Sequence, residues 1–205
     1  LTFTSMYKDF LNYSIEIKKL KFITDSGKQL PKTAILRFDI SGKSNPIVEL
    51  MGHYDQDDIF DLIDKEEDLD LSQCYIDKFS LSDYRRSRNL DEKHNVKIKN
   101  FKAENSFFDS PFFLDLGHAH FCGSIFSLQD SVVAKGEFMF NSSIFETSVI
   151  NFSHIHILSK DFDFSNVKVI KGDISFKNTI FGNGKKDFQY TDFGFGEKNF
   201  INIDF

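Results

Sequence analysis

Residues 176–205 read FKNTIFGNGKKDFQYTDFGFGEKNFINIDF, and an apolar residue recurs through them at alternating steps of five and seven positions. The same spacing starts at Phe140 and continues without a gap to Phe205. A twelve-residue repeat of this kind is typical of solenoid proteins, in which successive units stack on one another. The apolar ladder consists of Phe140, Phe145, Phe152, Ile157, Phe164, Val169, Phe176, Phe181, Phe188, Phe193, Phe200 and Phe205.

The ladder predicts where the side chains point and how long one turn is. In a strand, residues i and i−2 face the same way, and the residue two before a rung is mostly apolar or small, as Ile174 is before Phe176. Because the steps are odd, two rungs can both face inward only if the chain turns a corner between them. Four rungs then make one coil, which stacks Phe176 on Phe200 and Phe181 on Phe205. Glycine suits left-handed corners, and the longer steps contain Gly172, Gly182, Gly184, Gly194 and Gly196.

Looser repeat text extends this pattern toward the N-terminus. Apolar residues at steps of five occur in 71–81 and again in 98–113, and the register slips near 132–133. A polar stretch at about 85–96 interrupts the repeats, and we expect an excursion or a short helix there. The repeats therefore predict one domain over 69–205.

The segment 1–66 does not repeat. Alternation of apolar and polar residues predicts strands over 13–22, 33–40 and 47–51, with turn signals between them. Residues 55–67 are typical of a short amphipathic helix, because acidic residues gather at its N-terminal end. We expect residues 1–66 to form a β-rich α+β module that caps the repeats.

The repeat text resembles the pentapeptide-repeat proteins. Residues 70–84 and 98–113 match their five-residue step, and 143–145, 179–181 and 191–193 match the core pattern of a small residue two before phenylalanine. The match covers about two-thirds of the chain and departs from the family by two extra residues in alternate steps. The resemblance implies a mainly β fold, a right-handed parallel β-helix, here in a twelve-residue variant. It implies little about function, because a fold does not fix a function.

Composition excludes several classes of protein. The formal net charge of −6 is spread along the chain, and the repeats lack the basic stripe that nucleic-acid binding needs. No apolar run approaches the roughly 20 residues of a membrane span. The sequence contains no nucleophile elbow, phosphate loop or zinc-protease motif. We therefore expect no enzyme activity, no cofactor, no catalytic residue and no direct contact with nucleic acid or membrane.

Two His-x-His pairs, His118/His120 and His154/His156, are the candidates for metal binding. The ladder predicts that all four side chains face outward, where adjacent histidines could hold Zn²⁺ or Cu²⁺. The pairs are separated by one and a half coils, which puts them on opposite sides. A shared site is not expected, and surface histidines are the favoured interpretation.

Three other features carry charge or a thiol. The run Arg85–Arg88 could grip a phosphate or a partner carboxylate, although an exposed loop cluster is the favoured interpretation. The acidic run 55–70 lacks the pattern of a calcium loop and is expected to be a solvated helix face. Cys74 and Cys122 could be nucleophiles, but both lie beside apolar residues and are expected to be buried.

These observations favour a non-enzymatic scaffold or protein-interaction solenoid within a larger bacterial protein, and the cytoplasm as its compartment. One alternative is a DNA mimic, since some pentapeptide-repeat proteins imitate duplex DNA and bind DNA gyrase. The other is a targeting or delivery stalk of a toxin or enzyme. Phe205 falls on a rung with no polar cap after it, so we expect the native chain to continue or this edge to associate end to end.

Overall fold

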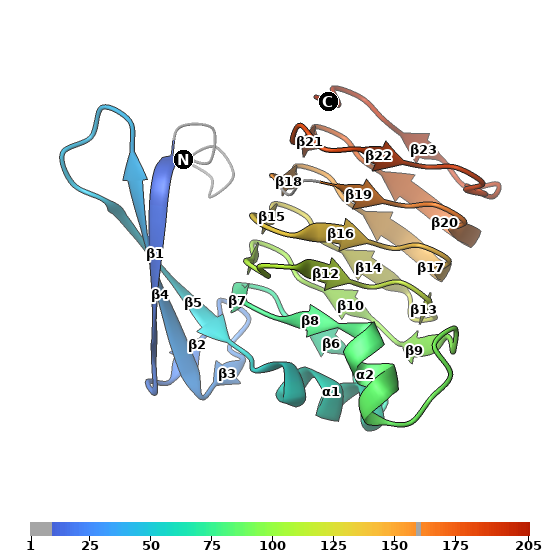
Figure 1. Ribbon diagram of the computed structural model, residues 1–205, viewed down its shortest axis with the longest axis horizontal. Coiled ribbons are helices and arrows are strands. Elements are labelled where there is room, and N and C mark those ends of the chain that lie inside the picture. Colours follow the sequence, from blue (N-terminus) through green and yellow to red (C-terminus); the bar gives the residue numbers. More distant parts are fainter. Residues whose placement is uncertain (1–9, 159–160) are drawn as a thin grey trace.

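The computed structural model describes residues 10–158 and 161–205 and is mainly β (Figure 1). Three long sheets contain nearly all of its strands. The first sheet has the order β1-β4-β5-β7-β11-β15-β18-β21, and the third has the order β22-β19-β16-β12-β8. The second follows β23-β20-β17-β14-β10-β6, with β13 and β9 joined to it through β17. Among the described residues, no helix is long and apolar enough to cross a bilayer.

The strands that follow Asp68 pair in parallel, and beyond Phe113 nearly all strand partners are separated along the chain by the one coil that the ladder predicts. Earlier pairs depart from that length, as Leu69 with Phe101 does, because a longer connection lies between them. Ile150 pairs with Ile174 in the second sheet, and Phe138 pairs with Phe162 in the third. These strands are β6 (Leu69–Asp70), β7 (Cys74–Ile76), β8 (Phe79–Ser80), β9 (Val96–Ile98), β10 (Phe101–Lys102), β11 (Phe107–Phe108), β12 (Phe113–Asp115), β13 (Ala119–Phe121), β14 (Ile125–Ser127), β15 (Val132–Val133), β16 (Glu137–Met139), β17 (Ile144–Asn151), β18 (His156–Ile157), β19 (Phe162–Asp163), β20 (Lys168–Ser175), β21 (Ile180–Phe181), β22 (Lys186–Asp187) and β23 (Lys198–Asn199).

Aromatic rings fill the space between the three sheets. The predicted stacks are confirmed: Phe176 lies on Phe200 with ring centroids 5.4 Å apart and planes within 9°, and Phe181 lies on Phe205 at 5.4 Å and 5°. The first eight rungs of the ladder, Phe140 to Phe181, are buried. The last two differ from the expected core, because Phe200 and Phe205 are 41% and 72% exposed. Each is covered on one ring face by the preceding turn.

The corners of the turns are built differently from the expectation. A residue with positive φ occurs every twelve positions, two places after a rung and thus in the five-residue step. Among the glycines of the longer steps, only Gly172 and Gly194 adopt positive φ. Asparagine and aspartate tolerate this conformation better than most residues, and the corner residues are His118, Asp130, Ser142, His154, Asn166, Asn178, Tyr190 and Asn202.

The slip of register arises earlier than the sequence suggested. Phe108 pairs with Val133, and Leu114 pairs with Phe138. The separation in sequence between the first two partners is one residue longer than that between the second two. The extra residue therefore lies in 109–113, a longer corner loop that exposes 76% of Phe112. The interruption at 85–96 is also displaced, because helix α2 (Leu81–Ser87) already begins at Leu81.

The N-terminal residues extend the first sheet. Their elements are β1 (Phe10–Lys18), β2 (Phe22–Ile23), β3 (Gln29–Leu30), β4 (Lys32–Ile40), β5 (Ile47–His53) and α1 (Gln56–Asp64). The strand predicted over 13–22 ends at Lys18, and Phe22 belongs to the small β2–β3 hairpin. β1, β4 and β5 are antiparallel, and β5 pairs in parallel with β7. One continuous sheet therefore joins the N-terminal strands to the repeats, on both sides of the boundary predicted at residues 66–69.

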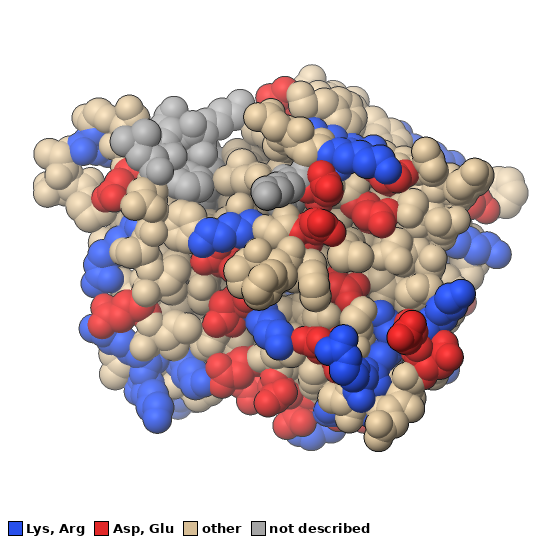
Figure 2. All heavy atoms as spheres, viewed as in Figure 1, with Lys and Arg blue, Asp and Glu red and all other residues tan. Residues whose placement is uncertain are grey.

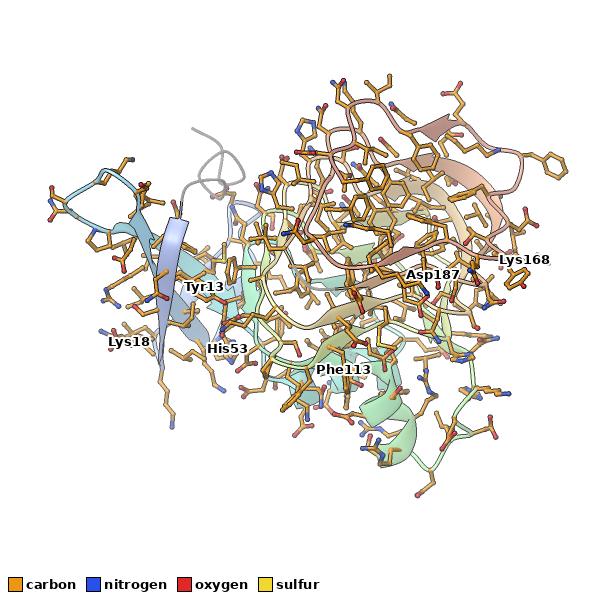
Figure 3. All side chains as sticks on the ribbon, turned by 45° about the horizontal axis from the view of Figure 1, so that its top comes forward. Tyr13, Lys18, His53, Phe113, Lys168 and Asp187 are labelled. Carbon is orange, nitrogen blue, oxygen red and sulfur yellow. The ribbon has the colours of Figure 1, made fainter. Side chains whose placement is uncertain are left out.

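This antiparallel part of the sheet packs on the outer face of the repeats. The rings of Tyr13 and Phe38 lie 5.3 and 5.6 Å from that of Phe107, and Figure 3 shows Tyr13 directed from β1 toward the repeats. Asp109, which is buried, accepts hydrogen bonds from the hydroxyls of Tyr13 and Tyr75 at 2.5 and 3.2 Å. At the other end of the module, α1 buries its apolar side in the main core.

Candidate functional site

The three long sheets all end at the last turn of the chain. β21, β23 and β22 are the terminal strands of the first, second and third sheets, and they lie together at the end of the stack in Figure 1. Two isolated bridges, Lys168 to Asp192 and Ile180 to Asp204, complete the pairing of that turn. A terminal strand presents unpaired N–H and C=O groups, which can accept a strand from another chain.

The same end of the molecule exposes its apolar interior. A hollow of about 210 Å³ opens there, and the described residues that line it are all phenylalanine or isoleucine. We call this surface the C-terminal face, formed by Phe188, Phe193, Phe200, Ile203 and Phe205. The last turn also carries Tyr190, Phe195 and Ile201 at 84%, 103% and 58% exposure. Large exposed apolar surfaces of this kind mark contact sites.

Charges of both signs lie beside the C-terminal face, and one ion pair joins two of them. Lys185 Nζ lies 2.6 Å from Asp187 Oδ2, and this hydrogen bond lowers the pKa of the Asp187 carboxyl and raises the pKa of Lys185. Lys198 Nζ donates to the backbone oxygen of Gly194 at 2.6 Å. The last turn therefore combines an apolar face with a surface of mixed charge.

The two histidine pairs lie on different sheets, as their spacing predicted. His120 belongs to β13 in the second sheet, and His156 belongs to β18 in the first. Among the described residues, no group of three or more His, Cys, Asp or Glu side chains is arranged to hold a metal. His120 Nε2 instead lies 3.0 Å from Glu146 Oε2, and His154 Nε2 lies 3.2 Å from Asn178 Nδ2.

The prediction that all four histidines face solvent is wrong for His156, which is 6% exposed. Its strand partner Val132 belongs to the second apolar cluster, beneath the N-terminal strands. The outer face of the first sheet is covered there, so an outward side chain becomes a buried one. His118 and His154 have a further structural role, because both occupy left-handed corners.

The arginine run is not the exposed loop cluster that we expected, because it lies on α2 and at the C-cap of that helix. Its three arginines have different partners. Arg88 pairs with Asp64 at 2.5 Å, which lowers the pKa of that carboxyl and fastens α2 to α1. Arg86 pairs with Asp83 at 3.1 Å and is largely exposed. Arg85 is buried, and it lines the same cleft as Arg86 and His118. No sequence signal indicates that juxtaposition, which depends on the path of α2.

The acidic run is mostly exposed, as expected of a solvated helix face, and the two cysteines differ in burial. Asp55 forms an ion pair with Lys32 and lies 3.1 Å from Nε2 of the buried His53, so it joins β4, β5 and the start of α1. Cys74 is buried, and burial raises the pKa of its thiol to about 12, which removes it as a nucleophile. Cys122 is exposed, contrary to the prediction, because it follows the inward Phe121 and faces the other way.

Comparison of the chain with protein-family models, curated proteins and solved structures finds no match.

Proposed function

We propose that residues 69–205 form a closed, right-handed parallel β-helix of the pentapeptide-repeat type, capped at its first turn by residues 1–66. The recurring one-coil offset between strand partners supports this winding. So does the aromatic core, in which the ring of Phe152 lies 5.4, 5.9 and 4.6 Å from the rings of Phe140, Phe164 and Phe176. Such a rod is held by contacts between adjacent turns, and it serves as a non-enzymatic scaffold for contacts with protein.

The observation that carries this function is the C-terminal face. It combines exposed rings with the terminal strands of three sheets. We propose a second copy of this chain as its occupant, joined end to end. In a two-fold dimer the same patch of each copy contacts its counterpart, so both apolar faces would be covered at once. Pairing would cover Phe200 and Phe205 as the preceding turn already covers their inner faces.

The surface charge supports a scaffold over a mimic of nucleic acid. Figure 2 shows lysine and arginine interspersed with aspartate and glutamate over the face in view. A DNA mimic needs a coherent negative field, which this mixture does not supply. We propose the cytoplasm as the compartment, since Cys74 and Cys122 are both free thiols and thiols stay reduced there.

Sedimentation equilibrium of the full chain over a wide concentration range tests the proposal. We expect a monomer–dimer equilibrium that Phe205→Asp shifts to monomer, because the substitution puts a charge into the apolar contact. Phe112→Asp is the matched control, since Phe112 is similarly exposed, at 76%, but lies in a side loop. A parent chain that stays monomeric would refute self-association, and a dimer that survives Phe205→Asp would place the interface elsewhere.

A further inference from the structure

A second surface feature, independent of the C-terminal face, lies beside α2. It is a cleft of about 690 Å³ between the α2–β9 connection and the corner after β12. We call it the α2 cleft, and the lining residues that matter here are Arg85, Arg86, Lys93, Asp115, His118 and Asn141. Its size falls in the range of about 300–1,000 Å³ that is usual for small-molecule sites.

One side chain of the α2 cleft lacks a partner. Asn141 Oδ1 is buried and finds no hydrogen-bond donor within residues 10–158 and 161–205. A Cβ on Gly117 would lie 2.6 Å from this oxygen, so a larger residue there would displace the Asn141 amide from its present position. Buried polar atoms in native proteins are nearly always bonded. The oxygen is therefore an acceptor for a hydroxyl or amine donor, which the described part of the chain does not supply.

The α2 cleft also holds positive charge. Arg85, which is 4% exposed, donates to Gly117 O at 2.9 Å and to Ser82 Oγ at 3.0 Å. A guanidinium has five N–H groups, so three of them have no acceptor in the described part of the chain. Arg86 and Lys93 add two more cations to the lining, and Glu92 is its exposed carboxylate.

The other carboxylate of the lining, Asp115, is already engaged. It is buried and accepts from Ser82 N at 2.9 Å and Ser80 Oγ at 3.2 Å through one oxygen, and from Gly117 N at 2.9 Å through the other. These hydrogen bonds join α2 to the corner after β12, so the Asp115 carboxylate has a structural role in the cleft. Arg86 also pairs with Asp83 at 3.1 Å, so the groups left to meet a ligand are the remaining N–H groups of Arg85 and Arg86, the ammonium of Lys93, the exposed carboxylate of Glu92 and one neutral acceptor.

The pKa of His118 depends on the charges that line the α2 cleft. Burial lowers the pKa of its imidazole, and the nearby Arg85 lowers it further; Lys93 acts in the same direction, while Asp115 and Asp91 oppose it. The ring is therefore neutral at neutral pH. An anion bound beside Arg85 would oppose this effect and raise the pKa of His118.

We propose that the α2 cleft binds a small phosphate monoester that also carries a hydroxyl group. The phosphate lies against Arg85, Arg86 and Lys93, because a guanidinium pairs bidentately with phosphate oxygens. The hydroxyl donates to Asn141 Oδ1. A dianion suits this group of cations better than a carboxylate does, and a sugar phosphate differs from inorganic phosphate in carrying hydroxyl groups on carbon, away from the phosphorus.

The test is calorimetric titration with glucose 6-phosphate, with inorganic phosphate, glucose and gluconate as comparison ligands. NMR titration of the His118 ring provides the second readout. We expect glucose 6-phosphate to bind most tightly and to raise the pKa of His118. Arg86→Gln removes an exposed charge without disturbing the core and should weaken binding about 10-fold or more. Lys102→Gln, at an exposed lysine outside the α2 cleft, is the matched control and should leave binding unchanged.

Asn141→Ala separates a ligand contact from a structural one. It should weaken glucose 6-phosphate about 3–10-fold while leaving inorganic phosphate unchanged. It should not lower the melting temperature, because the deleted oxygen has no partner to lose. The proposal is overturned if neither phosphate compound binds at millimolar concentration, if gluconate binds as tightly as glucose 6-phosphate, or if both variants bind like the parent.

Discussion

Phe164→Ala should be among the most destabilising single substitutions in this chain. Phe164 is fully buried, and its ring lies 5.6 Å from Phe140, 5.9 Å from Phe152, 5.9 Å from Phe176 and 5.7 Å from Phe188. It therefore contacts the turn below and the turn above as well as its own. Removing the ring leaves a cavity that these neighbours cannot fill without leaving their stacks.

The expected loss is about 3–5 kcal/mol, the usual cost of Phe→Ala in a core. A buried phenylalanine removes roughly 150–250 Å² from water, and about 25 cal/mol per Å² gives a similar figure once the retained methyl is subtracted. A loss of this size should appear as a clear shift of the urea midpoint followed by far-UV circular dichroism.

Phe195→Ala provides the matched control, because it deletes the same ring at a site that is 103% exposed. Its effect should stay within about 0.5 kcal/mol. If Phe164→Ala cost less than about 1 kcal/mol, or if the two variants unfolded at the same midpoint, Phe164 would not be packed in a core.

Local contacts make three further substitutions informative. Gly172→Ala should lower the free energy of unfolding, measured by urea titration, more than Gly42→Ala does. Both glycines have positive φ, but a Cβ at Gly172 would lie 2.0 Å from a backbone oxygen of the neighbouring turn, whereas a Cβ at Gly42 meets nothing within 4 Å. Equal losses would contradict the close approach at Gly172. Arg88→Gln should destabilise at pH 7, and the gap to the parent should close as pH falls below about 4. The reason is that Asp64, whose pKa Arg88 lowers from 3.8, contributes stability only while it is ionised; a gap independent of pH would exclude this ion pair. Phe176→Asp should abolish cooperative thermal unfolding, because it places a charge within a stacked apolar column; a melting curve like that of the parent would show that the column is not the core.

The ladder made the stacking of the repeats predictable, since period and side-chain direction follow from strand geometry. The pairing of Ile150 with Ile174 and the stack of Phe176 on Phe200 both agree with that geometry. The corners were less accessible. Corner residues recur every twelve positions, but their identities range from asparagine to tyrosine, and no single residue type marks them.

The α2 cleft could not be predicted from the sequence. Arg85 and His118 are far apart along the chain, and they line one cleft because α2 directly follows β8, the terminal strand of the third sheet. The burial of His156 has a similar cause, since it depends on where the N-terminal strands fold back. Alternation predicts which face a side chain occupies, but it does not tell which faces later become covered.

One cross-linking measurement tests the length of the turn most directly. Ser175 lies beside Asn199 in the parallel register of β20 and β23, whereas Asp187, halfway between them in the sequence, belongs to β22 in the third sheet. Both native cysteines are first replaced, and Ser175→Cys is then combined with Asn199→Cys. This pair should form a disulfide quantitatively on mild oxidation. The reason is that neighbouring strands are about 4.8 Å apart, and a disulfide spans about 4.4–6.8 Å between Cα atoms. Ser175→Cys with Asp187→Cys should stay reduced. A disulfide in the second pair and none in the first would contradict a coil of four rungs.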